Sequence, residues 1–151
     1  MIRQPLFGLL GFLALASCGG PPPPAVLNLT ITGSADQNPD PSGRPSPVAV
    51  RVYQLSGTAK FQQSDVFALK DSEAKTLGAE EATGSQEFLI APGDNKTVKI
   101  DLKPQVSSIG VAVMYQNIDQ AKWRAVEAAK ASGPTNLSAT VGKLALTLKG
   151  G

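Results

Sequence analysis

Apolar and polar residues alternate along several short segments of this chain, and this period of two limits the fold more than any other feature. The clearest case is residues 97–102 (TVKIDL), which end two residues before Pro104. Because successive residues of a β-strand point to opposite faces of a sheet, such a segment predicts a strand with one buried face and one solvated face. A fold built mainly from strands of this kind is therefore expected.

Other short segments also have strand character, and glycine, proline, asparagine and aspartate turns separate them. The further segments with visible alternation are 27–32, 48–55, 86–90 and 144–148. Residues 109–115 are apolar on both faces, which is typical of a central strand covered on both sides, whereas 123–128 fit either a strand or a helix. Six or seven short strands spaced by turns favour an all-β fold, a two-sheet antiparallel β-sandwich.

One interval, 61–78, breaks the strand pattern with residues that favour helices. Gly78 is placed to end a helix. Candidate N-caps are Ser64, Asp71 and Ser72. We expect one or two short helices inserted between strands, covering one edge or end of the sandwich. Arg51 and Tyr53 face outward on their strand, where such helices could cover them.

Two segments lack strand or helix signals. Residues 33–47 contain prolines at 39, 41, 45 and 47 and no other large apolar side chain. Loops of this length in a compact domain are usually functional or disordered. Residues 131–140, rich in glycine, proline and serine, are expected to form a surface connection.

The amino-terminal segment has the layout of a cleaved secretion signal. Arg3 gives it a positive start, residues 6–16 are uncharged and mostly apolar, and a Gly-Gly-Pro-Pro-Pro-Pro run follows Cys18. The apolar stretch is shorter than the about 20 residues that cross a bilayer. Residues 15–18 (LASC) resemble the bacterial lipobox, which implies acylation of Cys18 and cleavage before it. The alternative is ordinary signal cleavage near 14–16.

Cys18 is the only cysteine, so it has no disulfide partner in an oxidising compartment. A lone thiol there favours acylation. The expected boundaries are a signal peptide at 1–17, a lipidated and proline-rich tether at 18–25, and a β-sandwich domain at 26–151.

Composition argues against catalysis and against nucleic-acid binding. The chain has no histidine and, after acylation, no free thiol, which excludes serine–histidine and cysteine–histidine mechanisms and zinc sites built on these residues. A carboxylate pair or an oxygen-ligand cation site stays open on composition alone, but Glu80–Glu81 is expected to be solvated surface, and Asp36 with Asp40 lacks the spacing of a calcium loop. A net charge of +2 gives no electrostatic footprint for nucleic acid. We expect a binding protein without metal or cofactor, apart from the covalent lipid on Cys18, and not an enzyme.

Several segments, in order, resemble the TssJ (SciN) family, the outer-membrane lipoproteins of type VI secretion systems. The matching stretches are Asn38, 43–55 (GRPSPVAVRVYQL), Phe61, 64–69 (SDVFAL), Leu77, 92–93 (PG), 111–115 (VAVMY) and 118–124 (IDQAKWR). The resemblance implies a transthyretin-like sandwich with a short helical region around 61–78. It also implies a structural component of the trans-envelope membrane complex, one that tethers the periplasmic domain of the inner-membrane protein TssM.

In that family the contact with TssM is attributed to the loop between the first two strands, which is 33–47 here. The resemblance therefore implies a partner-binding set of Asp36, Gln37, Asn38, Pro39, Asp40, Pro41, Ser42, Gly43, Arg44, Pro45, Ser46 and Pro47. The prolines lower the entropy that the loop loses when a partner orders it, and Arg44 is a candidate charged anchor. The competing interpretation is a solvated connection that proline keeps extended.

Three single residues carry further expectations. Trp123 is expected in the core rather than at an interface, and Arg124 in a structural ion pair. Gly19 follows the acylated cysteine, at the position where aspartate retains enteric lipoproteins in the inner membrane. We therefore expect the periplasmic face of the outer membrane.

Two other functions compete with the structural one. A lipoprotein of this kind could bind a small ligand or a cell-wall component in a sandwich cleft; a deep polar pocket would favour this reading, and a closed core would count against it. A hydrolase of the transthyretin-related kind depends on histidines, which this chain lacks. No small-molecule substrate is expected.

Overall fold

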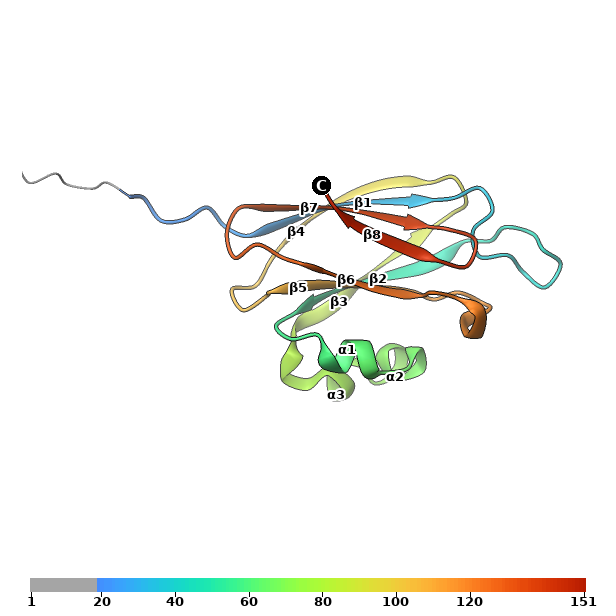
Figure 1. The fold of residues 1–151 in the computed structure, drawn as a ribbon, viewed down its shortest axis with the longest axis horizontal. Coiled ribbons are helices and arrows are strands. Elements are labelled where there is room, and N and C mark those ends of the chain that lie inside the picture. The colour runs from blue at the N-terminus through green and yellow to red at the C-terminus, as the bar shows by residue number, and fades with distance from the viewer. Residues whose placement is uncertain (1–18) are drawn as a thin grey trace, which may run out of the picture.

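The computed structural model describes residues 19–151, which form two sheets stacked face to face with short helices against one of them (Figure 1). The predicted signal peptide and Cys18 lie outside the described residues and remain predictions. The buried hydrophobic residues run from Leu27 to Leu148. The part of the chain from Gly19 onward thus contains this whole core, and we expect it to fold without the leader.

The first sheet has the strand order β4-β1-β7-β8. Its strands are β1 (Val26–Gly33), β4 (Asn95–Asp101), β7 (Pro134–Val141) and β8 (Leu146–Gly150). Because β1 is antiparallel to β4 but parallel to β7, the antiparallel sandwich contains one parallel pair. In β1, Leu27, Leu29 and Ile31 are fully buried and the residues between them are half-buried, as the alternation predicts.

The second sheet has the strand order β3-β2-β5-β6. Its strands are β2 (Val48–Leu55), β3 (Glu81–Ile90), β5 (Ser108–Val113) and β6 (Arg124–Ala128). The segment 123–128, which fitted a strand or a helix, is thus a strand from Arg124 onward. β5 lies between β2 and β6 and is buried from Ile109 to Val113, which confirms its prediction as a central, covered strand.

The expectation of a surface connection at 131–140 is wrong, because most of it belongs to β7. Pro134 opens this strand, a position that needs no amide donor. The inward-facing, buried residues are Thr135, Leu137, Ala139 and Val141. Small and hydroxylated residues occupy some of these inward positions, so the apolar signal was weak although the alternation is complete. β1 and β8 pair with the two edges of this strand, and only its inward face is buried.

Short helices form the insertion between β2 and β3. They are α1 (Ala59–Gln63), α2 (Val66–Asp71), α3 (Glu73–Leu77) and the 3₁₀ turn η1 (Gly78–Glu80), and a further 3₁₀ turn, η2 (Ile118–Gln120), lies in the β5–β6 connection. The insertion covers the outer face of the second sheet rather than an edge (Figure 1). Asp65, not Ser64, caps α2 by accepting the amide of Ala68 at 2.8 Å. Gly78 ends α3 with φ of 54°, as expected.

A second apolar cluster lies between this helical layer and the sheet. Its buried members are Tyr53, Leu55, Phe61, Leu69, Leu77 and Ala112. The rings of Tyr53 and Phe61 pack at a centroid distance of 5.1 Å. Gly110 leaves room for this packing, since a Cβ there would lie 3.0 Å from both Leu55 and Phe61. The helices therefore attach to the outward face of β2 and β5 by burying apolar side chains.

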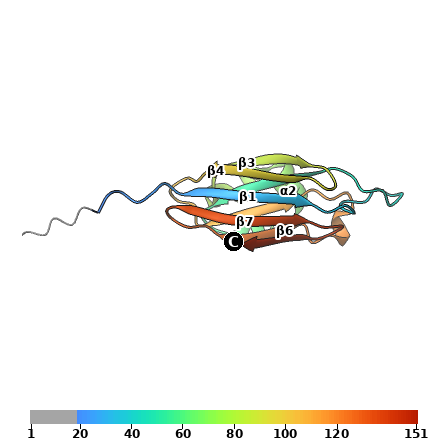
Figure 2. The same cartoon turned by 90° about the horizontal axis from the view of Figure 1, so that it is seen from above.

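The amino-terminal tether and the β1–β2 loop lie at opposite ends of the sandwich (Figure 1, Figure 2). At the tether end, the amide of Gly133 donates to the carbonyl oxygen of Pro23 at 3.2 Å, which fixes the last part of the tether to the domain. β1 runs from there to the far end, where residues 34–47 extend beside the β3–β4, β5–β6 and β7–β8 connections. A site on that loop faces away from the point of attachment.

Candidate functional site

The β1–β2 loop, residues 34–47, has a buried base and an exposed tip. At the base, Gln37 is fully buried although it is polar. Its Nε2 donates to the carbonyl oxygens of Ile90 at 2.7 Å and Ser46 at 3.2 Å. These bonds satisfy Nε2, whereas Oε1 is buried without a hydrogen-bond partner among the described residues, so the burial of this amide is compensated only in part. Gly33 makes this packing possible, because a Cβ there would lie 2.7 Å from the carbonyl oxygen of Ala91.

Asn38 ties the loop to two neighbouring connections. Its side chain donates from Nδ2 to the carbonyl oxygen of Pro47 at 3.0 Å and accepts the amide of Gln116 at Oδ1 at 2.8 Å. Its own amide donates to the carbonyl oxygen of Lys143 at 3.0 Å. Its φ of 44° is in the left-handed region, which asparagine tolerates better than most residues. Asn38 therefore sets the direction in which the tip leaves the domain.

Asp40 organises the tip as a closed turn. Its Oδ1 accepts the amides of Ser42 and Arg44, both at 2.9 Å, and its Oδ2 accepts Arg44 Nε at 2.8 Å. The backbone closes the same turn, with the Asp40 amide donating to the carbonyl oxygen of Arg44 at 2.8 Å. The hydrogen bond from the Arg44 amide is the main cause that holds the pKa of the Asp40 carboxyl below its usual range. The tip is thus preformed in the absence of a partner.

The tip presents a charged group and several proline rings to solvent. The Arg44 side chain is 79% exposed, although its Nε is paired with Asp40. Pro41 and Pro45 are exposed on either side of it. Proline rings are rigid, so this surface loses little conformational entropy when it is covered.

A cleft of about 590 Å³ separates the tip from the connections beside it. Its walls are Pro39, Asp40, Pro41 and Gly43 from the loop, Gln116 and Asn117 from the β5–β6 connection, and Lys143 from the β7–β8 turn. The sequence indicated the loop wall but missed the opposite one. Gln116, Asn117 and Lys143 form no local motif, and they come close to the loop only through folding.

The predicted partner-binding residues therefore divide into two groups. Gln37 and Asn38 lie inside the protein, where their side chains position the loop and do not face a partner. The other predicted residues, Asp36 and those from Pro39 to Pro47, lie on the surface, either half-buried or exposed. Direct contact remains a prediction for this second group only.

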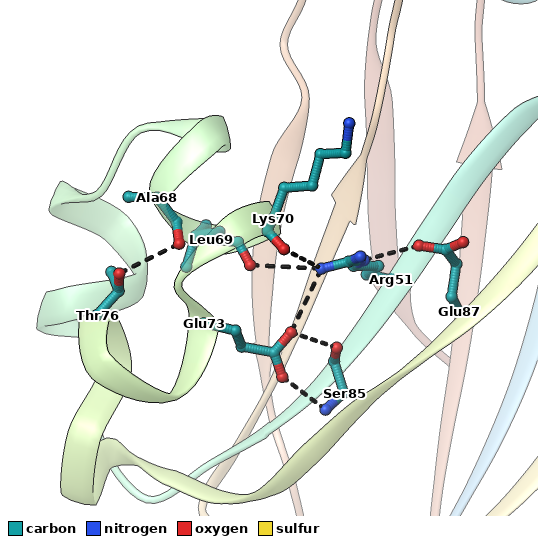
Figure 3. Close-up of polar contacts among 8 residues, drawn as sticks. All are labelled: Arg51, Ala68, Leu69, Lys70, Glu73, Thr76, Ser85 and Glu87. Carbon is teal, nitrogen blue, oxygen red and sulfur yellow. Dashed lines mark hydrogen bonds and ion pairs between the residues drawn. The ribbon is translucent and has the colours of Figure 1, made fainter.

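A second polar cluster lies beneath the helices and is shown in Figure 3. Arg51 Nε donates to Glu87 Oε2 at 2.8 Å, while its Nη1 donates to the carbonyl oxygens of Leu69 at 3.4 Å and Lys70 at 3.2 Å. Nη1 also lies 3.5 Å from Glu73 Oε2. Because the carbonyl groups at the end of a helix lack helical partners, Arg51 satisfies the end of α2 and fastens it to β2.

The expectation that Glu80–Glu81 is solvated surface is wrong. Glu80 Oε2 accepts the amide of Lys60 at the start of α1, at 2.8 Å. Glu81 is partly buried beside Glu73, and the pKa of Glu81 is raised to about 8. The main cause is burial, followed by the hydrogen bond with Glu73 and the negative charge of Glu73. Burial acts to raise the pKa of Glu73 as well, but hydrogen bonds from Glu81 and Ser85 outweigh it and lower that pKa. Glu80 therefore helps to hold the start of α1, whereas Glu81 Oε1 is buried without a hydrogen-bond partner among the described residues.

Within residues 19–151, Arg124 makes hydrogen bonds in place of the expected ion pair. Its Nη1 donates to the carbonyl oxygens of Phe61, at 2.8 Å, and Ser64. The guanidinium also lies 4.4 Å from the centroid of the Trp123 ring. Carbonyl groups at the end of α1 attract the cation in the way a carboxylate would. Trp123 is half-buried and packs against both apolar clusters.

The part of the chain that the structure describes has no group of three or more His, Cys, Asp or Glu side chains arranged to hold a metal ion. None of its helices has the length and apolar character needed to cross a membrane.

The fold and the loop define a class: a tethered β-sandwich that presents a structured loop at the end remote from its tether. A family model described as the type VI secretion lipoproteins VasD, EvfM and TssJ matches residues 25–146. The chain therefore belongs to the type VI secretion lipoprotein family. This is a family of structural secretion components and not a known enzyme family.

Solved structures agree with the family. The type VI secretion lipoprotein TssJ1 from Pseudomonas aeruginosa has a TM-score of 0.81 and 28% identity, over 85% of this chain and 98% of that one. Serratia marcescens Lip, a membrane-bound component of the type VI secretion system, has a TM-score of 0.76 and 23% identity, over 83% and 96%. A chain in a structure described as the TssM C-terminal domain (869–1107) from EAEC has a TM-score of 0.67 and 25% identity, over 83% and 98%. No curated protein sequence gives a significant match.

Proposed function

We propose that this chain is an outer-membrane lipoprotein that tethers the periplasmic domain of TssM within the type VI secretion membrane complex. The contact is made by the exposed tip of the β1–β2 loop. The observation that carries the proposal is the placement of this tip at the end of the sandwich opposite to the tether (Figure 1). A protein that links a membrane to a partner needs its anchor and its binding surface on opposite ends.

The tether is short, so the end of the domain that carries it stays close to the membrane. Pro23 is hydrogen-bonded to Gly133, so the free part of the tether is residues 19–22. At roughly 3 Å per residue, this part holds the near end of the domain within about 15 Å of an acylated Cys18. Acyl chains contribute about 0.8 kcal/mol for each buried CH₂, so two or more of them make release negligible. The loop tip then projects into the periplasm.

The conformation of the loop supports a binding role over that of a simple connection. Gln37 and Asn38 hold the base in one position, and Asp40 closes the tip. A loop that is already ordered loses less entropy on binding than a flexible one.

The structure that contains TssM gives independent support. The chain that matches there aligns over 98% of its own length with 83% of this 151-residue protein. TssM residues 869–1107 are longer than this entire protein, so we infer that the matching chain is a companion of TssM in that structure. A relative of this protein bound to TssM is the arrangement that the proposal requires.

The proposal is tested with the soluble domain from Gly19 onward and the cognate periplasmic domain of TssM. Replacing residues 39–45 by a glycine–serine segment of equal length removes the tip and keeps Gln37, Asn38 and Ser46. We expect binding, measured by isothermal titration calorimetry, to fall at least 100-fold with an unchanged melting temperature. The control replaces the exposed residues 103–105 at the tether end in the same way and should bind normally.

Two results would contradict this proposal. Undiminished binding by the tip replacement would place the TssM site elsewhere. If a Cys18→Ser protein stayed fully membrane-bound in cells, the proposed lipid anchor at Cys18 would be wrong. For the choice of membrane, Gly19→Asp tests the outer-membrane assignment, because in an enteric host this change should move the protein to the inner-membrane fraction.

The loop cleft favours a second candidate, the binding of a small ligand or cell-wall component. Its volume of about 590 Å³ is within the usual range of ligand sites, and Asp40, Asn117 and Lys143 supply polar groups. The space between the sheets, in contrast, is filled by the apolar core. Addition of soluble peptidoglycan fragments should then shift the NMR signals of Asn117 and Lys143, whereas unchanged spectra would eliminate this candidate for these fragments.

A further inference from the structure

A second hollow surface lies next to the loop cleft, at the start of α2. It consists of two adjoining cavities of about 150 and 300 Å³, and Val66, Phe67 and Ile118 line both of them. Gln116 lines the smaller cavity and also the loop cleft. The two cavities together are called the α2 groove. This groove and the loop cleft meet at the end of the molecule that is remote from the tether.

Phe67 forms an exposed apolar wall of the groove. It is 62% exposed, although phenylalanine is among the residues most often buried. In α2, Val66 and Leu69 are the buried residues, one helical turn apart, and Phe67 lies off their stripe. Together with the half-buried Ile118 and Met114 it surrounds the smaller cavity. The packing of the domain does not use this face of Phe67.

The larger cavity has an acidic side. Asp65 and Asp119 are exposed and line it. Arg124 also lines it, but its guanidinium donates to the carbonyl oxygens of Phe61 and Ser64, so its charge is directed toward the helical layer. A side chain that enters the groove would meet an apolar wall, with two carboxylates beside the larger cavity and the exposed Lys70 beside the smaller one.

The loop tip alone is small for a stable protein complex. A standard interface uses about 20–30 residues on each side. The predicted loop set, 36–47, contains 12 residues, and Gln37 and Asn38 among them are buried. A partner held by the tip therefore has to contact the adjoining surface as well. The α2 groove is an apolar part of that surface, and aromatic residues, phenylalanine included, are enriched in the cores of protein interfaces.

We propose that the α2 groove is a second contact site for TssM and receives an apolar side chain that is flanked by a basic residue. This inference rests on the proposed function. The apolar side chain packs between Phe67 and Ile118, while the basic group faces Asp119 across the acidic side of the larger cavity. The tip and the groove thus bind two separate elements of one partner.

The test measures binding of the TssM periplasmic domain by the soluble domain from Gly19 onward. Phe67→Ala should weaken binding at least 10-fold, because it removes the wall of the groove. The matched control is Leu89→Ala, since Leu89 is also a large apolar residue, is 69% exposed, and lies outside the groove; it should change binding less than 2-fold. Asp119→Asn should weaken binding several-fold and reduce its dependence on salt. Melting curves of each variant establish that the fold is intact.

The outcomes separate this inference from the proposed function. If the tip replacement abolishes binding while Phe67→Ala binds like the unchanged domain, the groove proposal is wrong and the proposed function stands. If the unchanged domain does not bind TssM at all, the proposed function fails first. Equal losses of affinity for Phe67→Ala and Leu89→Ala would indicate nonspecific hydrophobic association and would contradict the groove proposal. Sedimentation of the domain alone adds one more outcome: a dimer that Phe67→Ala abolishes would assign the groove to a second copy of this chain.

Discussion

The two appendages of the sandwich, the β1–β2 loop and the helical layer, are held by polar clusters of different charge. The loop base uses the neutral amides of Gln37 and Asn38, which bond to backbone groups. The helical layer uses Arg51, Glu73 and Glu81, which are charged or titratable. Neutral amides do not titrate, so the base of the loop should keep its shape across the pH range. The stability of the helical layer should depend on pH. Removing one of its polar side chains should also lower the free energy of unfolding more than a removal at the loop base.

The largest expected loss of stability follows from Arg51→Ala. This change removes the cation beside the Glu73 carboxylate, which keeps its hydrogen bonds from Ser85, and leaves the carbonyl groups at the end of α2 without their donor. Because this cluster is partly buried, we expect a cost of about 2–3 kcal/mol, at or below the lower end of the range for buried ion pairs. Urea unfolding should show that loss in the free energy of unfolding. Arg44→Ala, at an exposed arginine, is the control and should leave the unfolding midpoint unchanged; equal midpoints for the two variants would contradict the role given to Arg51.

The next effect is expected at the loop base. Asn38→Ala removes hydrogen bonds to Pro47 and Gln116 inside the protein, which should cost about 2 kcal/mol of stability. The loss should be the same at pH 5 and pH 8, since no titrating group is involved. Asn117→Ala, at an exposed asparagine nearby, provides the comparison and should cost much less. A loss that varied with pH would break the distinction between the two clusters.

A smaller effect of opposite sign is expected for Glu81→Gln. The pKa of Glu81 in the folded protein is about 8, above its usual 4.5, so the folded state binds this proton more tightly than the unfolded chain. Its contribution to stability is therefore complete below about pH 4.5 and is lost as the pH rises to about 8. The neutral glutamine mimics the protonated acid. Because Glu81 is only partly buried, solvent screening reduces the effect well below that of the full pKa shift, and the substitution should stabilise the domain by about 1 kcal/mol at pH 8 relative to its effect at pH 5. Urea midpoints at both pH values measure this, with Glu127→Gln as the control; parallel shifts in the two variants would refute the assignment.

The smallest effect on stability is expected at the tip. Asp40→Asn weakens the bonds that close the turn, yet the tip is on the surface and supports no core residue. The melting temperature should not change measurably. Binding to TssM should fall several-fold, because the tip would have to be ordered on binding. Unchanged affinity would mean that the preformed turn does not contribute to recognition.

The sequence predicted one half of the candidate site and missed the other. The length and prolines of 33–47 indicated a functional loop, since such patterns are local. The buried positions of Gln37 and Asn38 were not predictable, because polar residues in a loop are normally solvated. Phe67 carried no signal of its own either: in the sequence it is one more apolar residue in a helical insertion, and its exposure depends on which face of α2 meets the sheet.

The sequence by itself determined the sandwich, the helical insertion and the separation of tether from loop. These features follow from apolar periodicity and from glycine and proline positions, which act over a few neighbouring residues. Only the tertiary structure decided the parallel pairing of β1 with β7, the raised pKa of Glu81 and the joining of Gln116 and Lys143 to the loop. Each of these depends on segments far apart in the chain coming together. Burial and hydrogen bonding at such meeting points are properties of the whole fold, so no local pattern encodes them.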